Sequence, residues 1–162
     1  MNTSTNQPHF DRRTRTKKEI KQLIAERNSV LSQFYSLSNH VDDIEDVESF
    51  KESLQEFCQD MVDYIATGHF EIYRRIEDGI ERRDEILELS DDAFHKIINT
   101  TKAAINFNDL YDFTDELNPE ILKNFSHQLS ELGQNLATRI ELEDRFINTL
   151  LCPKPRLAYS SH

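Results

Sequence analysis

Residues 57–76 read FCQDMVDYIATGHFEIYRRI, and this stretch decides the fold. At about 100° per residue, one broad face collects the residues that a bundle helix buries. These are Leu54, Phe57, Met61, Ile65, Gly68 and Ile72. The opposite side carries Gln59, Asp63, Ala66, Phe70 and Tyr73. Aromatic residues are enriched at protein interfaces. The spacing therefore predicts a helix whose polar side is either a docking surface or the packing site of a second helix.

A resemblance to a known family rests on three blocks. In the first, the matching positions are Phe57, Cys58, Gln59, Val62, Asp63, Tyr64, Gly68, His69, Phe70, Ile72, Tyr73, Arg75 and Ile76. The second block, residues 132–151, agrees at Gly133, Leu136, Arg139, Leu142, Glu143, Asp144 and Leu150. Residues 20–37 fit more loosely, mainly through Arg27, Leu31, Tyr35 and Leu37. In these blocks the chain resembles the Rsd/AlgQ family, the regulators of sigma D, which are bacterial anti-sigma factors.

The resemblance implies both a fold and a function. It implies a helical bundle that binds the primary, sigma-70-class sigma factor, chiefly its C-terminal domain, which reads the −35 promoter element. Binding there sequesters sigma from core RNA polymerase and promoter DNA. We expect Asp63, Phe70 and Tyr73 to make the contacts, with Gln59 and Ala66 around them, provided that the helix is continuous through residue 68.

Composition independently predicts an all-α protein. The chain has 162 residues, enough for one domain with one core, and its three Gly and four Pro leave few places for the tight turns of a β fold. We predict an antiparallel up-and-down helical bundle of about four main helices with short additional helices. It should occupy residues 16–152, between a disordered N-terminal tail, residues 1–15, and a flexible C-terminal tail, residues 153–162.

Periodicity places the first two helices. The first should run from Thr16 to Ser38, with an apolar stripe made of Ile20, Leu23, Ile24, Leu31, Phe34 and Tyr35. The second should begin near Val47, after the acidic connector 41–48. Gly68 either kinks this helix or marks the point where Thr67 caps a new one.

Capping signals place the later helices. Ser90, followed by two aspartates, predicts the N-cap of a third helix. Residues 106–119 are ambiguous between an extension of that helix and a loop. Asn118, Pro119 and Glu120 then read as the start of a last helix that runs to Leu151, because proline is favoured at the first helical position.

Charge separates the two ends of the chain and predicts a basic partner. Residues 1–27 hold seven Lys and Arg against three acids, a net charge of +4. The remaining residues carry −15, which gives the chain its total of −11. Such a body should repel DNA and attract basic surfaces. No apolar run reaches the roughly 20 residues that span a bilayer, and the basic N-terminus has no apolar segment after it. Together with a buried, reduced Cys58, these features predict a cytoplasmic location without membrane contact.

Motifs for catalysis and metal binding are missing from the sequence. Di-iron bundles use a Glu from each of two helices and two Glu-x-x-His motifs, and the nearest pattern here is a single Asp92-Ala-Phe-His95. Neither a Gly-rich phosphate loop nor a nucleophile elbow is found. We therefore expect no enzyme activity, no metal or cofactor, and no small-molecule substrate.

One polar cluster interrupts the apolar pattern. Glu143 lies near the centre of the stripe of the last helix, Arg139 lies one turn earlier at its edge, and Arg27 interrupts the stripe of the first helix. A buried carboxylate without a partner costs several kcal/mol, so we predict that Glu143 pairs with Arg27, Arg139 or both, with His69 near the same network. This network either fixes helix register or serves as a catalytic acid or base.

Two further functions stay open beside the anti-sigma reading. One is a helical adaptor that binds another cytoplasmic regulatory or metabolic protein. The other is a bundle enzyme or ligand carrier, which requires an enclosed polar pocket around Glu143 and Arg139.

Overall fold

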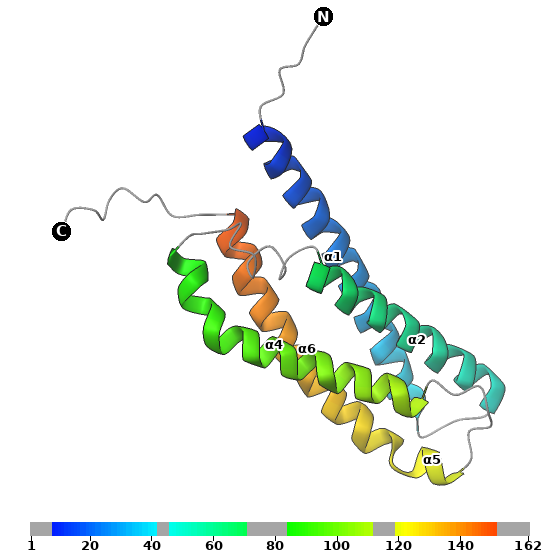
Figure 1. Ribbon diagram of the computed structural model, residues 1–162. Coiled ribbons are helices and arrows are strands. Elements are labelled where there is room, and N and C mark those ends of the chain that lie inside the picture. The colour runs from blue at the N-terminus through cyan, green and yellow to red at the C-terminus, as the bar shows by residue number, and fades with distance from the viewer. Residues whose placement is uncertain (1–7, 42–45, 71–83, 112–118, 152–162) are drawn as a thin grey trace, which may run out of the picture.

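The computed structural model describes residues 8–41, 46–70, 84–111 and 119–151. Within these ranges it contains helices and no strand: α1 (Pro8–His40), α2 (Val47–Gly68), α4 (Asp84–Tyr111), α5 (Pro119–Lys123) and α6 (Phe125–Leu151). The four long helices run alternately down and up in one bundle, with the short α5 at one end (Figure 1). The helix α1 packs mainly on α2, α6 packs mainly on α4, and α2 joins the two pairs through α4. The predicted all-α bundle is confirmed.

The core face of α1 follows a heptad spacing. Steps of four and three residues separate the members of this face, namely Thr16, Ile20, Leu23, Arg27, Val30, Phe34 and Leu37. Such a 3.5-residue period is typical of helices that pack nearly antiparallel in a bundle. The period explains why the prediction of Tyr35 as a core residue is wrong. Tyr35 is 64% exposed, whereas Val30 and Leu37, which the predicted stripe omitted, are buried.

The core residues of α2 match the predicted face. Leu54, Phe57, Met61, Ile65 and Gly68 are all buried, and Ile72 lies outside the described residues. Cys58 is also buried and carries a free thiol. The helix begins at Val47, as predicted, because Asp46 accepts hydrogen bonds from the backbone N–H groups of the first turn.

Aromatic rings close the end of the bundle beside α5. The ring of Phe125 lies 5.3 Å from that of Phe50 and 5.1 Å from that of Tyr111, both nearly edge to face. Phe107 contacts Phe57 in the same way at 6.1 Å. Offset and edge-to-face pairs add stability beyond their buried area. This aromatic layer therefore fixes α2, α4 and α6 against one another.

Several predicted boundaries need correction. The helix α1 begins at Pro8, so residues 8–15 belong to a helix and not to a disordered tail. Proline suits a first helical position, and the following Arg and Lys residues are good helix formers. Residues 1–7 and 153–162, predicted as tails, lie outside the described residues, as does Cys152.

Two capping predictions in the second half also differ from the structure. Ser90 lies inside α4, because extending a helix adds a hydrogen bond per residue whereas starting a new one carries a nucleation cost. The last helix is broken at Asn124, whose carbonyl accepts the first hydrogen bond of α6 from Gln128. Asparagine is a preferred N-cap residue, and the prediction overlooked it. The ambiguous segment 106–119 is helical as far as Tyr111.

The cap at Asp46 and the interior position of Ser90 can be tested as a pair. Asp46→Ala removes an acceptor that lies 3.1 Å from the Glu48 N–H and 3.3 Å from the Ser49 N–H. It should lower the free energy of unfolding by about 1 kcal/mol in urea titrations. Ser90→Ala should cause no loss, because alanine is favoured inside a helix. A loss of about 1 kcal/mol for Ser90→Ala would instead show that residue 90 caps a helix.

Candidate functional site

The most buried charged groups of the described residues lie together on α6. Arg139 is 0% exposed and Glu143 is 1% exposed, and the two are one helical turn apart. The helix places them on its core stripe because residues four apart share one face. Two ionised groups inside a hydrophobic core require partners on every side.

The carboxylate of Glu143 has partners from three helices. Its Oε2 lies 3.3 Å from Nε of Arg139 on the same helix, and its Oε1 lies 3.6 Å from a guanidinium nitrogen of Arg27 on α1. The hydroxyl of Tyr64 on α2 donates a hydrogen bond to the same Oε1 at 2.5 Å. The structure thus brings together Arg27, Arg139 and Glu143, three of the four residues assigned to this network from the sequence.

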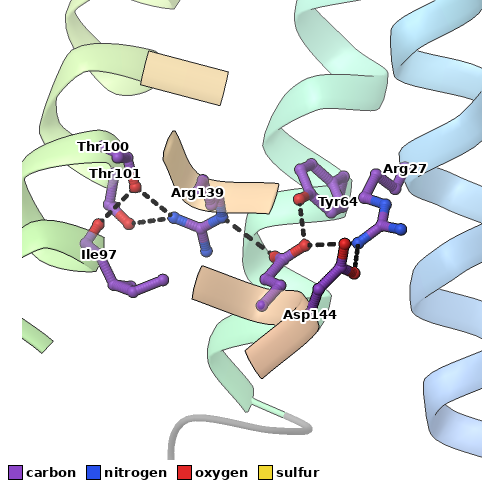
Figure 2. Close-up of polar contacts among 8 residues, drawn as sticks. Arg27, Tyr64, Ile97, Thr100, Thr101, Arg139 and Asp144 are labelled. Atoms are coloured by element: carbon purple, nitrogen blue, oxygen red, sulfur yellow. Dashed lines mark hydrogen bonds and ion pairs between the residues drawn. The ribbon is translucent and has the colours of Figure 1, made fainter. Parts of the chain in front are cut away.

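The network continues outward from both arginines (Figure 2). Arg139 donates hydrogen bonds to the hydroxyls of Thr100 at 3.1 Å and Thr101 at 2.8 Å, which brings in α4. Arg27 donates to Asp144 at 2.9 Å. The guanidinium carbon of Arg139 also lies 5.8 Å from the centre of the Tyr64 ring, within the range of a cation–π contact. Every long helix therefore contributes to one polar network.

Burial and charge set the ionisation of Tyr64. Burial raises the pKa of its hydroxyl above the usual 10, and the negative charge and hydrogen bond of Glu143 raise it further. The pKa of Arg27 is also raised, because Asp144 and Glu143 outweigh the opposing effect of burial. Tyr64 is therefore a neutral donor and Arg27 a permanent cation at neutral pH. The Tyr64 hydroxyl therefore donates to Glu143 without losing its proton at neutral pH.

His69 does not belong to this network, and its assignment there was wrong. It is exposed at the end of α2, and its ring stands edge-on to that of Phe70 at 5.0 Å. Successive residues of a helix point about 100° apart, so residue 69 points away from the core stripe that contains the buried Gly68. Sequence reasoning missed Tyr64, Thr100, Thr101 and Asp144. Tyr64 had a usable signal: its position on the core face of α2 requires a buried partner for the hydroxyl.

The outer face of α2 keeps the surface residues named from the sequence. Gln59 and Asp63 are exposed, and the Gln59 side-chain amide donates a hydrogen bond to Asp63 at 3.1 Å. Ala66 is half-buried and Phe70 is 58% exposed. His69 keeps right-handed helical backbone angles, so the chain does not break immediately after Gly68. Tyr73 lies outside the described residues.

Within residues 8–41, 46–70, 84–111 and 119–151, no three His, Cys, Asp or Glu side chains are grouped as metal ligands. No helix in those ranges is both long and apolar enough to cross a membrane.

Comparison with known proteins places the chain among sigma regulators. The family model described as regulator of RNA polymerase sigma(70) subunit, Rsd/AlgQ, matches residues 3–151. The regulator of sigma D of Yersinia enterocolitica is 32% identical over 98 residues, which are 60% of this chain and 58% of that protein. Its counterpart in Pectobacterium atrosepticum is 31% identical over 98 residues, 60% of this chain and 63% of the relative. The chain thus spans about three fifths of the length of these relatives. No solved structure matches it significantly.

The buried ion pair can be tested by a double-mutant cycle. Arg139→Met leaves the buried carboxylate of Glu143 without its nearest cation and should lower the free energy of unfolding by roughly 3–5 kcal/mol. Glu143→Leu should also destabilise strongly, and the double variant should lose less than the sum of the two. Glu141→Gln, which breaks the exposed pair with Arg145, is the control and should cost less than about 1 kcal/mol. Additive losses for Arg139 and Glu143 would contradict the coupling.

The raised pKa of Tyr64 predicts a loss of stability in alkali. Below pH 10 the hydroxyl is protonated in both the folded and unfolded chains, so the contribution is fully present. Above pH 10 the unfolded chain loses this proton and the folded chain keeps it, so stability should fall by about 1.4 kcal/mol per pH unit from this group. Urea titrations between pH 8 and 11 should show that Tyr64→Phe reduces this slope, with a remainder from Tyr111, whose pKa burial also raises. Tyr35→Phe, at an exposed position, should retain it.

Proposed function

Because the chain belongs to the Rsd/AlgQ family of regulators of the RNA polymerase sigma(70) subunit, we propose that it is an anti-sigma factor. It binds the primary, sigma-70-class sigma factor, chiefly the C-terminal domain that reads the −35 element. In doing so it keeps sigma from core RNA polymerase and promoter DNA. The observation that carries the proposal is the family match, which extends over residues 3–151 and thus over all the described helices.

The proposed binding surface is the outer face of α2. Asp63 is exposed and held by Gln59, so its carboxylate is oriented to accept hydrogen bonds from an Arg or Lys of sigma. Phe70 is more than half exposed and lies about two helical turns beyond Asp63, where it supplies an apolar anchor on the same face. The small side chain of Ala66 between them allows a partner to approach the helix closely. Tyr73 is kept in this surface on its sequence spacing.

Charge supports the same kind of partner. Residues 28–162 carry a net charge of −15, and the sigma domain in question is a basic DNA-binding module. Opposite fields of this kind raise the rate of encounter and favour the correct partner. The acidic body also disfavours direct DNA binding. Inhibition of sigma is therefore stoichiometric, because the protein occupies the sigma surface. It takes place in the cytoplasm, where transcription occurs.

Catalysis has little support from the buried network. Arg139 and Glu143 are at most 1% exposed, and their charged groups face protein partners. A substrate has no access to groups buried in this way. We therefore assign the network to stability and helix register, and the function to the surface.

Binding of the isolated C-terminal domain of the primary sigma factor tests the proposal. Titration calorimetry should show one-to-one binding that weakens as salt is raised. Asp63→Ala should weaken it roughly 10- to 100-fold, the equivalent of a charge-assisted hydrogen bond. Asp109→Ala, which removes an exposed aspartate from α4, is the matched control and should change the affinity less than twofold.

The outcomes separate the readings of function. If sigma does not bind at all, the anti-sigma function is wrong, and an adaptor for another regulatory or metabolic protein becomes the leading hypothesis. If sigma binds equally to the wild type and Asp63→Ala, the function stands and the outer face of α2 is not the binding surface.

A further inference from the structure

A furrow runs along the surface between α1 and α6. It consists of two hollows of about 490 and 450 Å³, and Phe34, Gly133 and Ala137 line both of them. One hollow extends to Ser126 and the other to Asp144, so the furrow follows α6 for roughly 27 Å at 1.5 Å per residue. That length equals about five turns of helix.

The furrow exists because small residues face a single large ring. The helices α1 and α6 contact one another much less than each contacts its main neighbour. Across this gap, Phe34 rests directly on the backbone of α6: a Cβ atom on Gly133 would lie 2.6 Å from its Cζ. Ala137, one turn further on, is also small. The ring therefore divides the furrow, and an unfilled hollow remains on each side of it.

The furrow is lined mainly by apolar side chains and carries two acidic residues at one end. In the hollow toward Asp144, Leu31, Leu136 and Ile140 form the apolar part, and Tyr35, which is 64% exposed, lies beside them. The side chains of Glu141 and Asp144 are 69% and 52% exposed at this end, and one oxygen of each pairs with Arg145 and Arg27 respectively. The other hollow is edged by serines at positions 38, 126 and 130. Apolar surface with one-sided charge is suited to recognise a partner of defined orientation.

We propose that this furrow is a second docking surface, which receives a basic amphipathic helix of a partner protein. Apolar side chains spaced three, four or seven residues apart on such a helix enter the hollows on either side of Phe34. A Lys or Arg at one end shares the exposed carboxylates of Glu141 and Asp144 with their intramolecular partners Arg145 and Arg27. The net charge of −15 on residues 28–162 favours a basic helix over an acidic one. The outer face of α2 takes no part, so this proposal does not depend on sigma binding there.

A synthetic peptide provides the probe. We would use an 18-residue helical peptide with leucines at one face and lysines along its edges, together with a version in which glutamates replace the lysines. Fluorescence anisotropy should show saturable binding of the lysine peptide to the full chain, and binding of the glutamate version at least tenfold weaker. Asp63→Ala should leave the affinity unchanged within twofold.

Two variants that add the same charge locate the site. Ala137→Arg places a long cationic side chain at a residue that lines both hollows, whereas Thr138→Arg adds the same charge at the next residue, which is exposed and lines neither hollow. We expect Ala137→Arg to weaken peptide binding at least tenfold and Thr138→Arg to change it less than twofold, with unfolding in urea alike for both. Equal effects of the two variants, or no saturable binding, would overturn the proposal.

Other occupants of the furrow give different results. If a chain ending at Leu151 bound the peptide at least tenfold more tightly, the chain's own C-terminal segment would be the occupant. If sedimentation showed a dimer that Ala137→Arg dissociates, the occupant would be a second copy. If Ala137→Arg weakened binding of the sigma domain, the furrow would belong to the sigma-binding surface. Each of these outcomes overturns the docking of a separate basic helix.

Discussion

The buried carboxylate of Glu143 is the constraint on which the arrangement of the helices depends. An ionised group at 1% exposure is tolerated only when hydrogen bonds and opposite charges replace its lost water. Here the replacements come from different helices: Tyr64 from α2, Arg27 from α1 and Arg139 from α6 itself, which is held in turn by threonines of α4. A shift of one helix along its axis would break at least one of these contacts. The apolar core favours a bundle of some kind, whereas the polar network specifies one register.

The fixed register has consequences for the surface. With α1 locked to α6 through Arg27 and the two acids, the two helices meet at one end of their shared surface, and Phe34 and Gly133 set their distance further along. The hollows on the two sides of Phe34 are therefore products of the packing and do not require a partner to form. The outer face of α2 is set by the same contacts, because burying Tyr64 turns Asp63 toward solvent.

Sequence reasoning succeeded where a side chain violated the local pattern. Charged residues on apolar stripes pointed to the partners of Glu143, and Phe70 on the polar side of the predicted helix is exposed. It failed where two interpretations differ by a small rotation or by one residue. A period of 3.5 residues places Val30 on the core face and Tyr35 outside it, whereas a period of 3.6 favours Tyr35. His69 was assigned to the buried network in place of Tyr64, although the two side chains leave the helix in different directions. Capping residues such as Ser90 and Asn124 have similar local preferences, and only tertiary packing decides which of them begins a helix.

The charge of the network explains why the surface alone carries the electrostatic function. Arg27 and Arg139 balance Glu143 and Asp144, so the four residues sum to zero and the net charge of −11 is borne by the rest of the chain. Tyr64 stays protonated across the physiological pH range, because burial and Glu143 raise its pKa, so its hydrogen bond to Glu143 is retained there. A hydroxyl that keeps its proton does not couple pH to helix register in that range. Salt acts instead on exposed groups, where charges are screened and exchange partners readily.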